Sequence, residues 1–152
     1  MRASRAALER TRIGEVSLTF LGTSSAIPTL RRNVTSAVLR ADGEAVLVDV
    51  RTDAEREWVG FVPGAVPVAW KQWPGMAMNP TFDQQVRDAA AGRKLVLLCR
   101  SGVRSVAAAQ RATQLGLEAY NILEGFEGDP DASAHRGQRG GWRFHGLPWR
   151  QN

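Results

Sequence analysis

Cysteine, histidine and lysine are scarce in this chain of 152 residues. A single cysteine excludes an intrachain disulfide, a cysteine-rich zinc site and a dithiol redox pair within one chain. The two histidines, His135 and His145, are too few to build a histidine metal centre readily, so we expect neither a metal nor another cofactor. Any covalent chemistry at sulfur must therefore depend on Cys99 alone.

Long apolar runs are also absent, because no stretch approaches the roughly 20 apolar residues that a membrane span requires. The apolar stretch 16–21 follows several arginines, but it is too short for the core of a secretory signal. Glu9 and Glu15 also interrupt the basic region before it. We therefore expect a cytoplasmic protein that does not bind a membrane, and one reduced thiol is compatible with that compartment.

The formal net charge of +5 comes almost wholly from arginine, since lysine occurs only at positions 71 and 94. A basic chain suggests a nucleic-acid partner. Here, however, the arginines are scattered from Arg2 to Arg150, and acidic residues such as Asp53 and Glu57 lie among them. This pattern indicates an arginine-rich surface, and we expect no nucleic acid among the partners.

Two strongly apolar runs, residues 45–50 and 94–98, are typical of strands buried on both faces of a parallel sheet. Further strands are expected at 66–70 and 119–123, and helical segments at 54–59, 80–90 and 106–115. This alternation predicts a single α/β domain with a mainly parallel central sheet flanked by helices. Ligands of such sheets bind beyond the carboxyl ends of the strands, and Cys99 directly follows one of these ends.

The segment from Cys99 to Ser105 joins a buried strand to a helix. In that place the sulfur is surrounded by backbone N–H groups and faces the positive end of a helix, which favours the reactive thiolate. Arg100 and Arg104 add positive charge, and Gly102 permits a tight turn. The alternative is an inert, buried cysteine, but a thiol that only packs in a core needs no cationic loop. The pattern therefore indicates a nucleophile.

These residues resemble the active-site loop of rhodanese-like sulfurtransferases. Asp49, Arg51 and Glu55 match the Asp-x-Arg and following acid at a strand end of that family. Residues 62–65 match its Pro-Gly-Ala turn, and residues 120–126 match its last strand and Gly-rich turn. The resemblance extends over residues 34–152 and implies a three-layer α/β fold.

The resemblance implies an activity as well. Cys99 would accept a sulfane sulfur from a small-molecule donor such as thiosulfate, become a persulfide, and pass the sulfur to cyanide or to a thiol, which can belong to an acceptor protein. The loop residues would bind the substrate: Arg100, Ser101, Gly102, Val103, Arg104 and Ser105.

Other residues would act in supporting roles. We expect Asp49, Arg51 and Glu55 to hold the loop through buried polar contacts rather than to take part in the chemistry. Trp70 and Trp73 lie in a loop after a strand, where they either form an apolar rim over the site or fill the core. In two places the chain departs from the family pattern, because Phe61 and Pro67 stand where many rhodanese-like domains carry histidine.

Two other functions are compatible with the loop. Protein tyrosine phosphatases and their relatives place five residues between cysteine and arginine, whereas four separate Cys99 from Arg104. The shorter loop suits a sulfur atom better than a tetrahedral phosphate, so a phosphatase or an arsenate reductase is the second hypothesis. A non-catalytic rhodanese-like binding module is the third, although the intact cysteine and complete loop disfavour it.

The N-terminal part has a different resemblance. Residues 17–33 are similar to the opening of ribonuclease Z and related metallo-β-lactamase-fold hydrolases, but the chain has no His-x-His-x-Asp-His metal motif, so we expect no nuclease. We divide the chain into residues 1–33, a foreign or loosely attached segment, and residues 34–152, the rhodanese-like domain. Within the first part we expect a frayed helix or a disordered arm over 1–12. Residues 16–21 would form a strand that can add to the central sheet, and residues 34–41 a helix.

Overall fold

The computed structural model of the chain describes residues 9–13, 16–20 and 45–152. The chain forms two compact units, residues 1–45 and 46–152. In the first unit, β1 (Glu9–Ile13) and β2 (Val16–Phe20) pair as antiparallel strands.

The strand expected at 16–21 is confirmed, but it pairs with β1 in a two-stranded sheet instead of extending the central sheet. The expected helix or arm over 1–12 is wrong for residues 9–12, which belong to a strand because they pair with β2. The helix expected at 34–41 lies outside the described residues.

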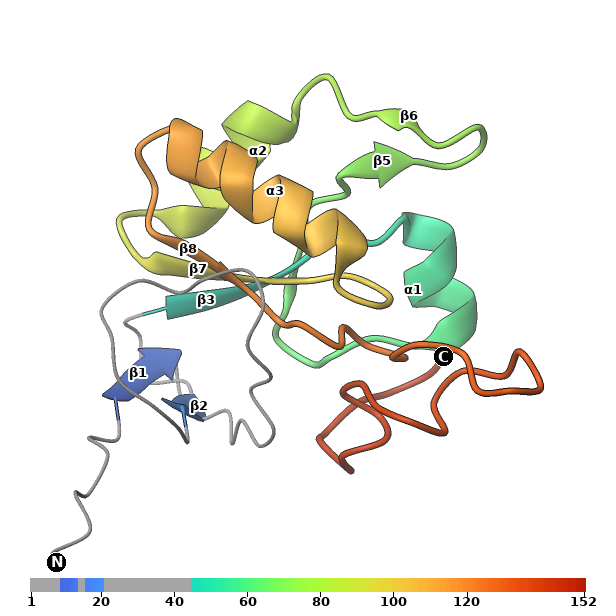
Figure 1. The fold of residues 1–152 in the computed structure, drawn as a ribbon. Helices are drawn as coiled ribbons and strands as arrows, with labels where there is room; N and C mark the ends of the chain where they lie inside the picture. The colour runs from blue at the N-terminus through green and yellow to red at the C-terminus, as the bar shows by residue number, and fades with distance from the viewer. Residues whose placement is uncertain (1–8, 14–15, 21–44) are drawn as a thin grey trace, which may run out of the picture. The chain divides into compact units, whose positions relative to one another are not determined.

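The second unit is built on a four-stranded sheet with the order β4-β3-β7-β8 (Figure 1). The two apolar runs form its central strands, β3 (Ala45–Asp49) and β7 (Lys94–Leu98), and every residue of β3 is buried. The outer strands, β4 (Val66–Pro67) and β8 (Ala119–Asn121), pair with them in parallel. The predicted α/β class with a mainly parallel sheet is therefore confirmed.

Strand β4 is shorter than the predicted 66–70. Pro67 has no N–H to donate to a neighbouring strand, and the regular strand ends there. The next residues still follow β3, since the N–H groups of Val68 and Trp70 donate to the carbonyls of Asp49 and Val50 at 3.0 Å each. The expected segment therefore runs along the sheet, but only its first part is a strand.

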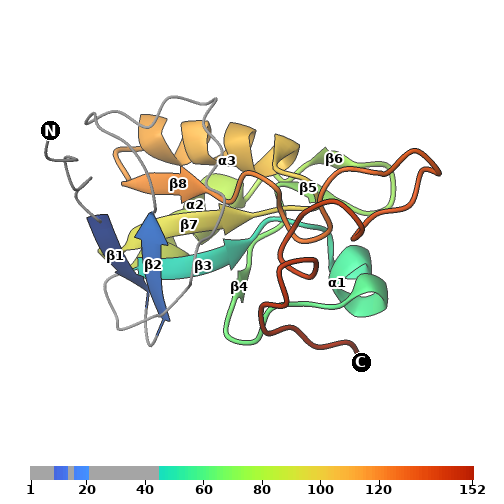
Figure 2. The ribbon, with the colours of Figure 1, turned by 60° about the horizontal axis from the view of Figure 1, so that its bottom comes forward.

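Three helices accompany the sheet: α1 (Asp53–Val59), α2 (Phe82–Ala90) and α3 (Val103–Gln114). Helices α2 and α3 pack on the same face of the sheet, whereas α1 lies near the carboxyl ends of the strands, beside the C-terminal segment (Figures 1 and 2). Apolar side chains of β3, β7, α2 and α3 form one core, in which burying each large side chain contributes about 1.5–3 kcal/mol. The flanking helices of the predicted fold are thus present.

Between β4 and α2 the chain forms a small hairpin. Its strands β5 (Lys71–Gln72) and β6 (Ala77–Met78) pair antiparallel, with Lys71 opposite Met78. Asn79 anchors this hairpin, because its side-chain amide donates to the carbonyl of Ala69 and to the side chain of Gln85, both at 2.8 Å. The hairpin is therefore tied to the first turn of α2.

The chain after β8 has little regular structure and is held by close backbone contacts. Phe61 and Arg150 exchange backbone hydrogen bonds of 2.8 and 2.9 Å, so the last residues return to the end of α1. Gly128 and Gly141 meet back to back: a Cβ atom on Gly141 would lie 2.4 Å from the nitrogen of Gly128. No side chain fits at this crossing.

We expect Gly141→Ala to destabilise the domain through this crossing. Gly141 has φ of +97°, and a new methyl group would collide with backbone rather than with a flexible side chain. Gly146→Ala is the matched control, because Gly146 also has positive φ (+67°) but open space around it. Urea unfolding should show a loss of about 1–2 kcal/mol for the control and about 1–3 kcal/mol more for Gly141→Ala. Equal losses would contradict the close approach.

Candidate active site

Cys99 directly follows β7 at the carboxyl edge of the sheet and is 1% exposed. Its Sγ accepts a hydrogen bond from the backbone N–H of Gly102 at 3.1 Å. The hydroxyl oxygen of Ser105 lies 3.4 Å from Sγ and 3.0 Å from the carbonyl oxygen of Gly102, so its one proton can serve either acceptor. The sulfur is thus held by polar groups although it is buried.

The loop leads directly into α3, so the N-terminus of this helix lies at the sulfur. The helix begins at Val103 rather than at 106, because Gly102 takes the left-handed conformation (φ +93°) and turns the chain into it. The N–H groups of a first helical turn have no acceptor in the preceding turn, and they carry the positive end of the helix dipole. Those of Val103 to Ser105 are suited to stabilise negative charge at Cys99.

Two glycines let the backbone close around the loop. A Cβ atom on Gly102 would lie 1.9 Å from the carbonyl oxygen of Leu123, and one on Gly125 would lie 2.5 Å from the carbonyl oxygen of Cys99. Both glycines have positive φ, +93° and +64°. Neither position can take a larger residue without moving the loop or its support.

The C-terminal segment braces the loop from behind. The N–H of Phe126 donates to the carbonyl of Cys99 at 2.7 Å, and the N–H of Glu127 donates to that of Arg100 at 2.9 Å. Our sequence reasoning did not assign Gly125, Phe126 and Glu127 to the site. The signal was present, since the matched family segment ends in this glycine and phenylalanine.

Arg104 and Glu55 join the loop to α1. The guanidinium of Arg104 donates to both carboxylate oxygens of Glu55, at 2.7 and 2.5 Å. Glu55 also accepts the backbone N–H of Thr52 at 3.0 Å, which caps α1. Burial raises the pKa of Glu55. The hydrogen bonds from Arg104 and Thr52 and the positive charge of Arg104 outweigh this effect, and together they lower the pKa from 4.5 to about 2. The same contact raises the pKa of Arg104.

This pairing shows where the Arg104 charge is directed. Its carboxylate partner holds the guanidinium in a bidentate geometry, so the side chain fixes the start of α3 against α1. Arg100, by contrast, is exposed beside Cys99. The raised pKa of Arg104 reflects its contact with Glu55 first and its interaction with Cys99 as well, so the charge of Arg104 also acts on the sulfur.

Asp49 and Arg51 form a buried pair behind the loop. Arg51 donates to Asp49 through Nε at 3.0 Å and through Nη2 at 2.6 Å, and Nη2 also donates to the carbonyl of Gly60 at 2.8 Å. Its guanidinium lies 4.0 Å from the ring centre of Phe126. The backbone N–H of Phe126 donates to the carbonyl of Cys99, so Arg51 is linked to the loop through Phe126. The supporting role of Asp49 and Arg51 stays a prediction that this geometry favours.

The remaining predicted residues are the two tryptophans and two members of the loop. Trp70 is half-buried and packs edge-on against Phe82, with ring centres 4.7 Å apart. Trp73 is 66% exposed at the hairpin tip and lines a cavity of about 560 Å³ together with Asp53. Ser101 is half-buried and Val103 exposed, both in the loop itself. The structure thus groups residues 99–105 with Glu55. Trp70 packs on the core that includes Cys99, whereas Trp73 lines a cavity that none of residues 99–105 lines, and the rim over the site stays a prediction.

Within the described ranges, no group of three or more His, Cys, Asp or Glu side chains is arranged to hold a metal ion. His145 instead lies 2.7 Å from Glu124, whose Oε2 also accepts the N–H of Gly141 at 2.8 Å. None of the helices in this part of the chain is both long and apolar enough to span a bilayer.

The low pKa of Glu55 predicts a pH-dependent contribution to stability. A carboxyl group whose pKa falls on folding stabilises the protein above its unfolded value, 4.5, and this contribution is lost as the pH falls toward about 2. Glu55→Gln should therefore lower the free energy of unfolding by about 1–3 kcal/mol near neutral pH, and the difference from wild type should shrink in acid. Urea unfolding at several pH values measures it. The control is the same substitution in an Arg104→Met background, where a difference of unchanged size would contradict the pairing.

Comparison with known proteins supports the family that the sequence resembles. Residues 36–129 match the family described as the rhodanese-like domain. The crystal structure of Rv0390 from M. tuberculosis is similar, with a TM-score of 0.66 and 46% identity over 72% of this chain and 86% of that chain. An uncharacterized protein from Rickettsia conorii, RC0915, is 33% identical over 118 residues, which cover 74% of this chain and 88% of that protein.

The short resemblance to ribonuclease Z is found as well. The enzyme from Natronomonas pharaonis is 43% identical over 47 residues, 31% of this chain and 15% of that protein. So small a share of the enzyme transfers neither its fold nor its activity. The longer matches agree with the observed sheet and with the loop at Cys99, and the chain belongs to the family of rhodanese-like domains.

Proposed function

We propose that this chain is a sulfurtransferase in which Cys99 carries a sulfane sulfur as a persulfide. The observation that carries the proposal is the position of Sγ at the carboxyl edge of the sheet, 3.1 Å from the N–H of Gly102 and at the start of α3. Membership of the rhodanese-like family supports chemistry at this cysteine. Thiosulfate is the donor that we propose for testing.

In the first step the thiolate of Cys99 attacks the outer sulfur of thiosulfate. A new S–S bond forms while the S–S bond of thiosulfate breaks, and sulfite leaves with the electron pair. Three negative charges enter the step and three leave it, one on the persulfide and two on sulfite. No oxidant, reductant or proton is needed.

In the second step an acceptor attacks the terminal sulfur of the persulfide. Cyanide forms thiocyanate, or a thiolate forms a new persulfide, and in either case Cys99 leaves as thiolate. The sequence contains no second cysteine to take up the sulfur, so the acceptor must come from outside this chain. The protein therefore acts as a carrier between two other molecules.

Backbone N–H groups explain why the loop suits this cycle. The negative charge lies on Sγ before the first step and on the terminal sulfur after it, one S–S bond further out. N–H groups fixed by Gly102 and by the first turn of α3 can stabilise both positions without moving. The bond from Gly102 at 3.1 Å shows one such group already directed at Sγ.

The phosphatase hypothesis receives less support from the geometry. A tetrahedral oxyanion is best held by a guanidinium fork that is free to bind it. Both terminal nitrogens of Arg104 already donate to Glu55, at 2.7 and 2.5 Å. The binding-module hypothesis needs no reactive sulfur, and the polar contacts of the buried Cys99 have no explanation under it.

The decisive measurement is the mass of the intact protein after incubation with thiosulfate. We expect the wild type to gain one sulfur atom, to lose it when cyanide is added, and to release thiocyanate in equal amount. Cys99→Ala should gain no sulfur and produce no thiocyanate, while its urea unfolding curve shows that it remains folded.

Other outcomes would point to the alternatives. Hydrolysis of an aryl phosphate without any gain of sulfur from thiosulfate would contradict the proposal and favour a phosphatase. Sulfur transfer at the wild-type rate by Cys99→Ala would refute the role of this cysteine. Wild-type protein that gains no sulfur from thiosulfate or from a small persulfide would indicate a binding module.

A further inference from the structure

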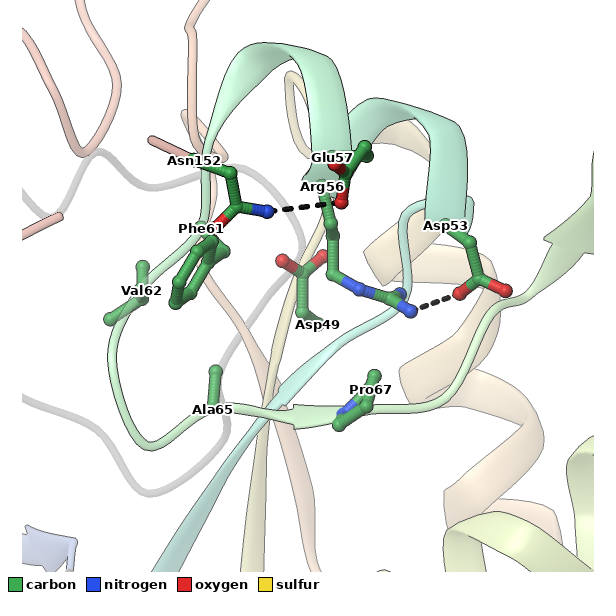
Figure 3. Close-up of a pocket in the computed structure, with 9 residues that line it drawn as sticks. All are labelled: Asp49, Asp53, Arg56, Glu57, Phe61, Val62, Ala65, Pro67 and Asn152. Atoms are coloured by element: carbon green, nitrogen blue, oxygen red, sulfur yellow. Dashed lines mark hydrogen bonds and ion pairs between the residues drawn. The ribbon is translucent and has the colours of Figure 1, made fainter. Parts of the chain in front are cut away.

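Two cavities lie side by side along α1. The first has a volume of about 350 Å³ and the second of about 560 Å³. They share three lining residues, Asp53, Arg56 and Pro67, so they adjoin at the Asp53–Arg56 ion pair, and we call the two cavities together the groove. In Figure 3 this pair stands at one side of the first cavity and Phe61 at the other. Cys99 lines neither cavity.

Each half of the groove combines an aromatic ring with a carboxylate. In the first half these are Phe61 and Glu57, and in the second half they are Trp73 and Asp53. Lysine and arginine side chains bind well to such sites, because their apolar stems pack on the ring and their charged ends meet the carboxylate. Phe61 and Pro67 make this surface apolar at two positions where many rhodanese-like domains carry histidine.

The charge of the groove is opposite in sign to that of the whole chain. Its ionisable lining consists of Asp49, Asp53, Glu57 and Arg56, whereas the chain carries a net charge of +5. Arg51 already pairs with Asp49, and Arg56 pairs with Asp53 and donates to the carbonyl of Arg51 at 2.9 Å. Glu57 accepts the carboxamide of Asn152 at 3.0 Å, and no ion pair within residues 45–152 involves its carboxylate. A cationic group is therefore favoured there.

We propose that this groove docks an extended, basic segment of a partner protein, with a lysine or arginine side chain against Glu57 in the first cavity and a neighbouring residue of the segment against the ring of Trp73 in the second. Two adjoining cavities, of which the first is acidic and the second has a neutral ion pair beside an indole, suit consecutive residues of one backbone better than a single small molecule. Two carboxamide side chains of the second half, Gln72 and Gln85, add groups of the kind that hydrogen-bond a peptide backbone, while Asn79 beside them is already bonded to Ala69 and Gln85. Nucleic acid, with its phosphates, is disfavoured by the same carboxylates.

The groove lies next to the cysteine loop without being part of it. Asp53, Arg56 and Glu57 belong to α1, the helix whose Glu55 holds Arg104 of the loop. A partner held along α1 is therefore bound beside the carboxyl edge where Cys99 lies. Docking needs no sulfur chemistry, so it can be tested independently of the proposed function.

The test is fluorescence anisotropy with the full chain and a fluorescein-labelled peptide of alternating lysine and glycine. Matched peptides carry serine or glutamate in place of every lysine. We expect saturable binding of the lysine peptide, weaker binding of the serine peptide and none of the glutamate peptide. The Cys99→Ala variant should bind as wild type does, which separates docking from sulfur transfer.

Matched variants locate the binding. Glu57→Gln and Trp73→Ala should each weaken binding of the lysine peptide by about threefold to fivefold. Asp88→Asn removes the same charge from the exposed surface of α2, and Trp58→Ala removes an indole that is 77% exposed but lines neither cavity. Both controls should leave the affinity unchanged.

Several results would overturn the proposal. Equal weakening by Asp88→Asn and Glu57→Gln would mean that the peptide responds only to overall charge. Equal affinity for the lysine and serine peptides would remove the role of the carboxylates. Free lysine amide that binds as tightly as the peptide would indicate a small amine as the ligand in place of a partner protein.

Discussion

The structure depends on one constraint, the closeness with which backbone surrounds the loop after β7. Gly102 and Gly125 stand where a single added carbon would overlap the carbonyl oxygens of Leu123 and Cys99. Close contact of this kind lets the N–H of Phe126 hold the carbonyl of Cys99 at 2.7 Å. On its other side the loop directs the N–H of Gly102 at the sulfur, at 3.1 Å. The proposed anion site is thus built from backbone and needs no side chain to adjust.

Charged side chains in the domain serve mainly to hold this backbone. Arg104 pairs with Glu55, and Arg51 pairs with Asp49 and lies over the ring of Phe126. Removing one member of a buried pair leaves the other charge without a partner, which costs more than the pair itself contributes. The pairs therefore act as fixed connections between α1, the loop and the C-terminal segment. At the sulfur itself, the N-terminus of α3 adds the positive end of a helix dipole.

The sequence predicted what depends on local pattern. Buried strands follow from apolar runs, and the loop follows from a cysteine, a glycine and two arginines within a few positions. It did not predict the role of Phe126, because that role arises from a contact with a residue far away along the chain. Both Glu55 and Arg104 were predicted, yet not as partners, since a bidentate pair needs the two helix starts to meet. The start of α3 was misplaced because the left-handed turn at Gly102 begins the helix early.

Two surfaces that favour ligands of opposite charge lie near the carboxyl edge of the sheet. The loop at Cys99 favours an anion, and the groove along α1 favours a cation. This combination is useful if Cys99 carries sulfur as proposed. The persulfide is anionic, and an attacking thiolate is repelled by it, so the encounter between them is slow when both are free in solution. Docking a basic segment of the acceptor at a distance from the sulfur raises the effective concentration of its thiol at the loop. Because Cys99 lines neither cavity, these docking contacts do not themselves stabilise the resting persulfide. The separation of the groove from Cys99 therefore fits the proposed carrier, which must bind its acceptor with useful affinity and still transfer its sulfur readily.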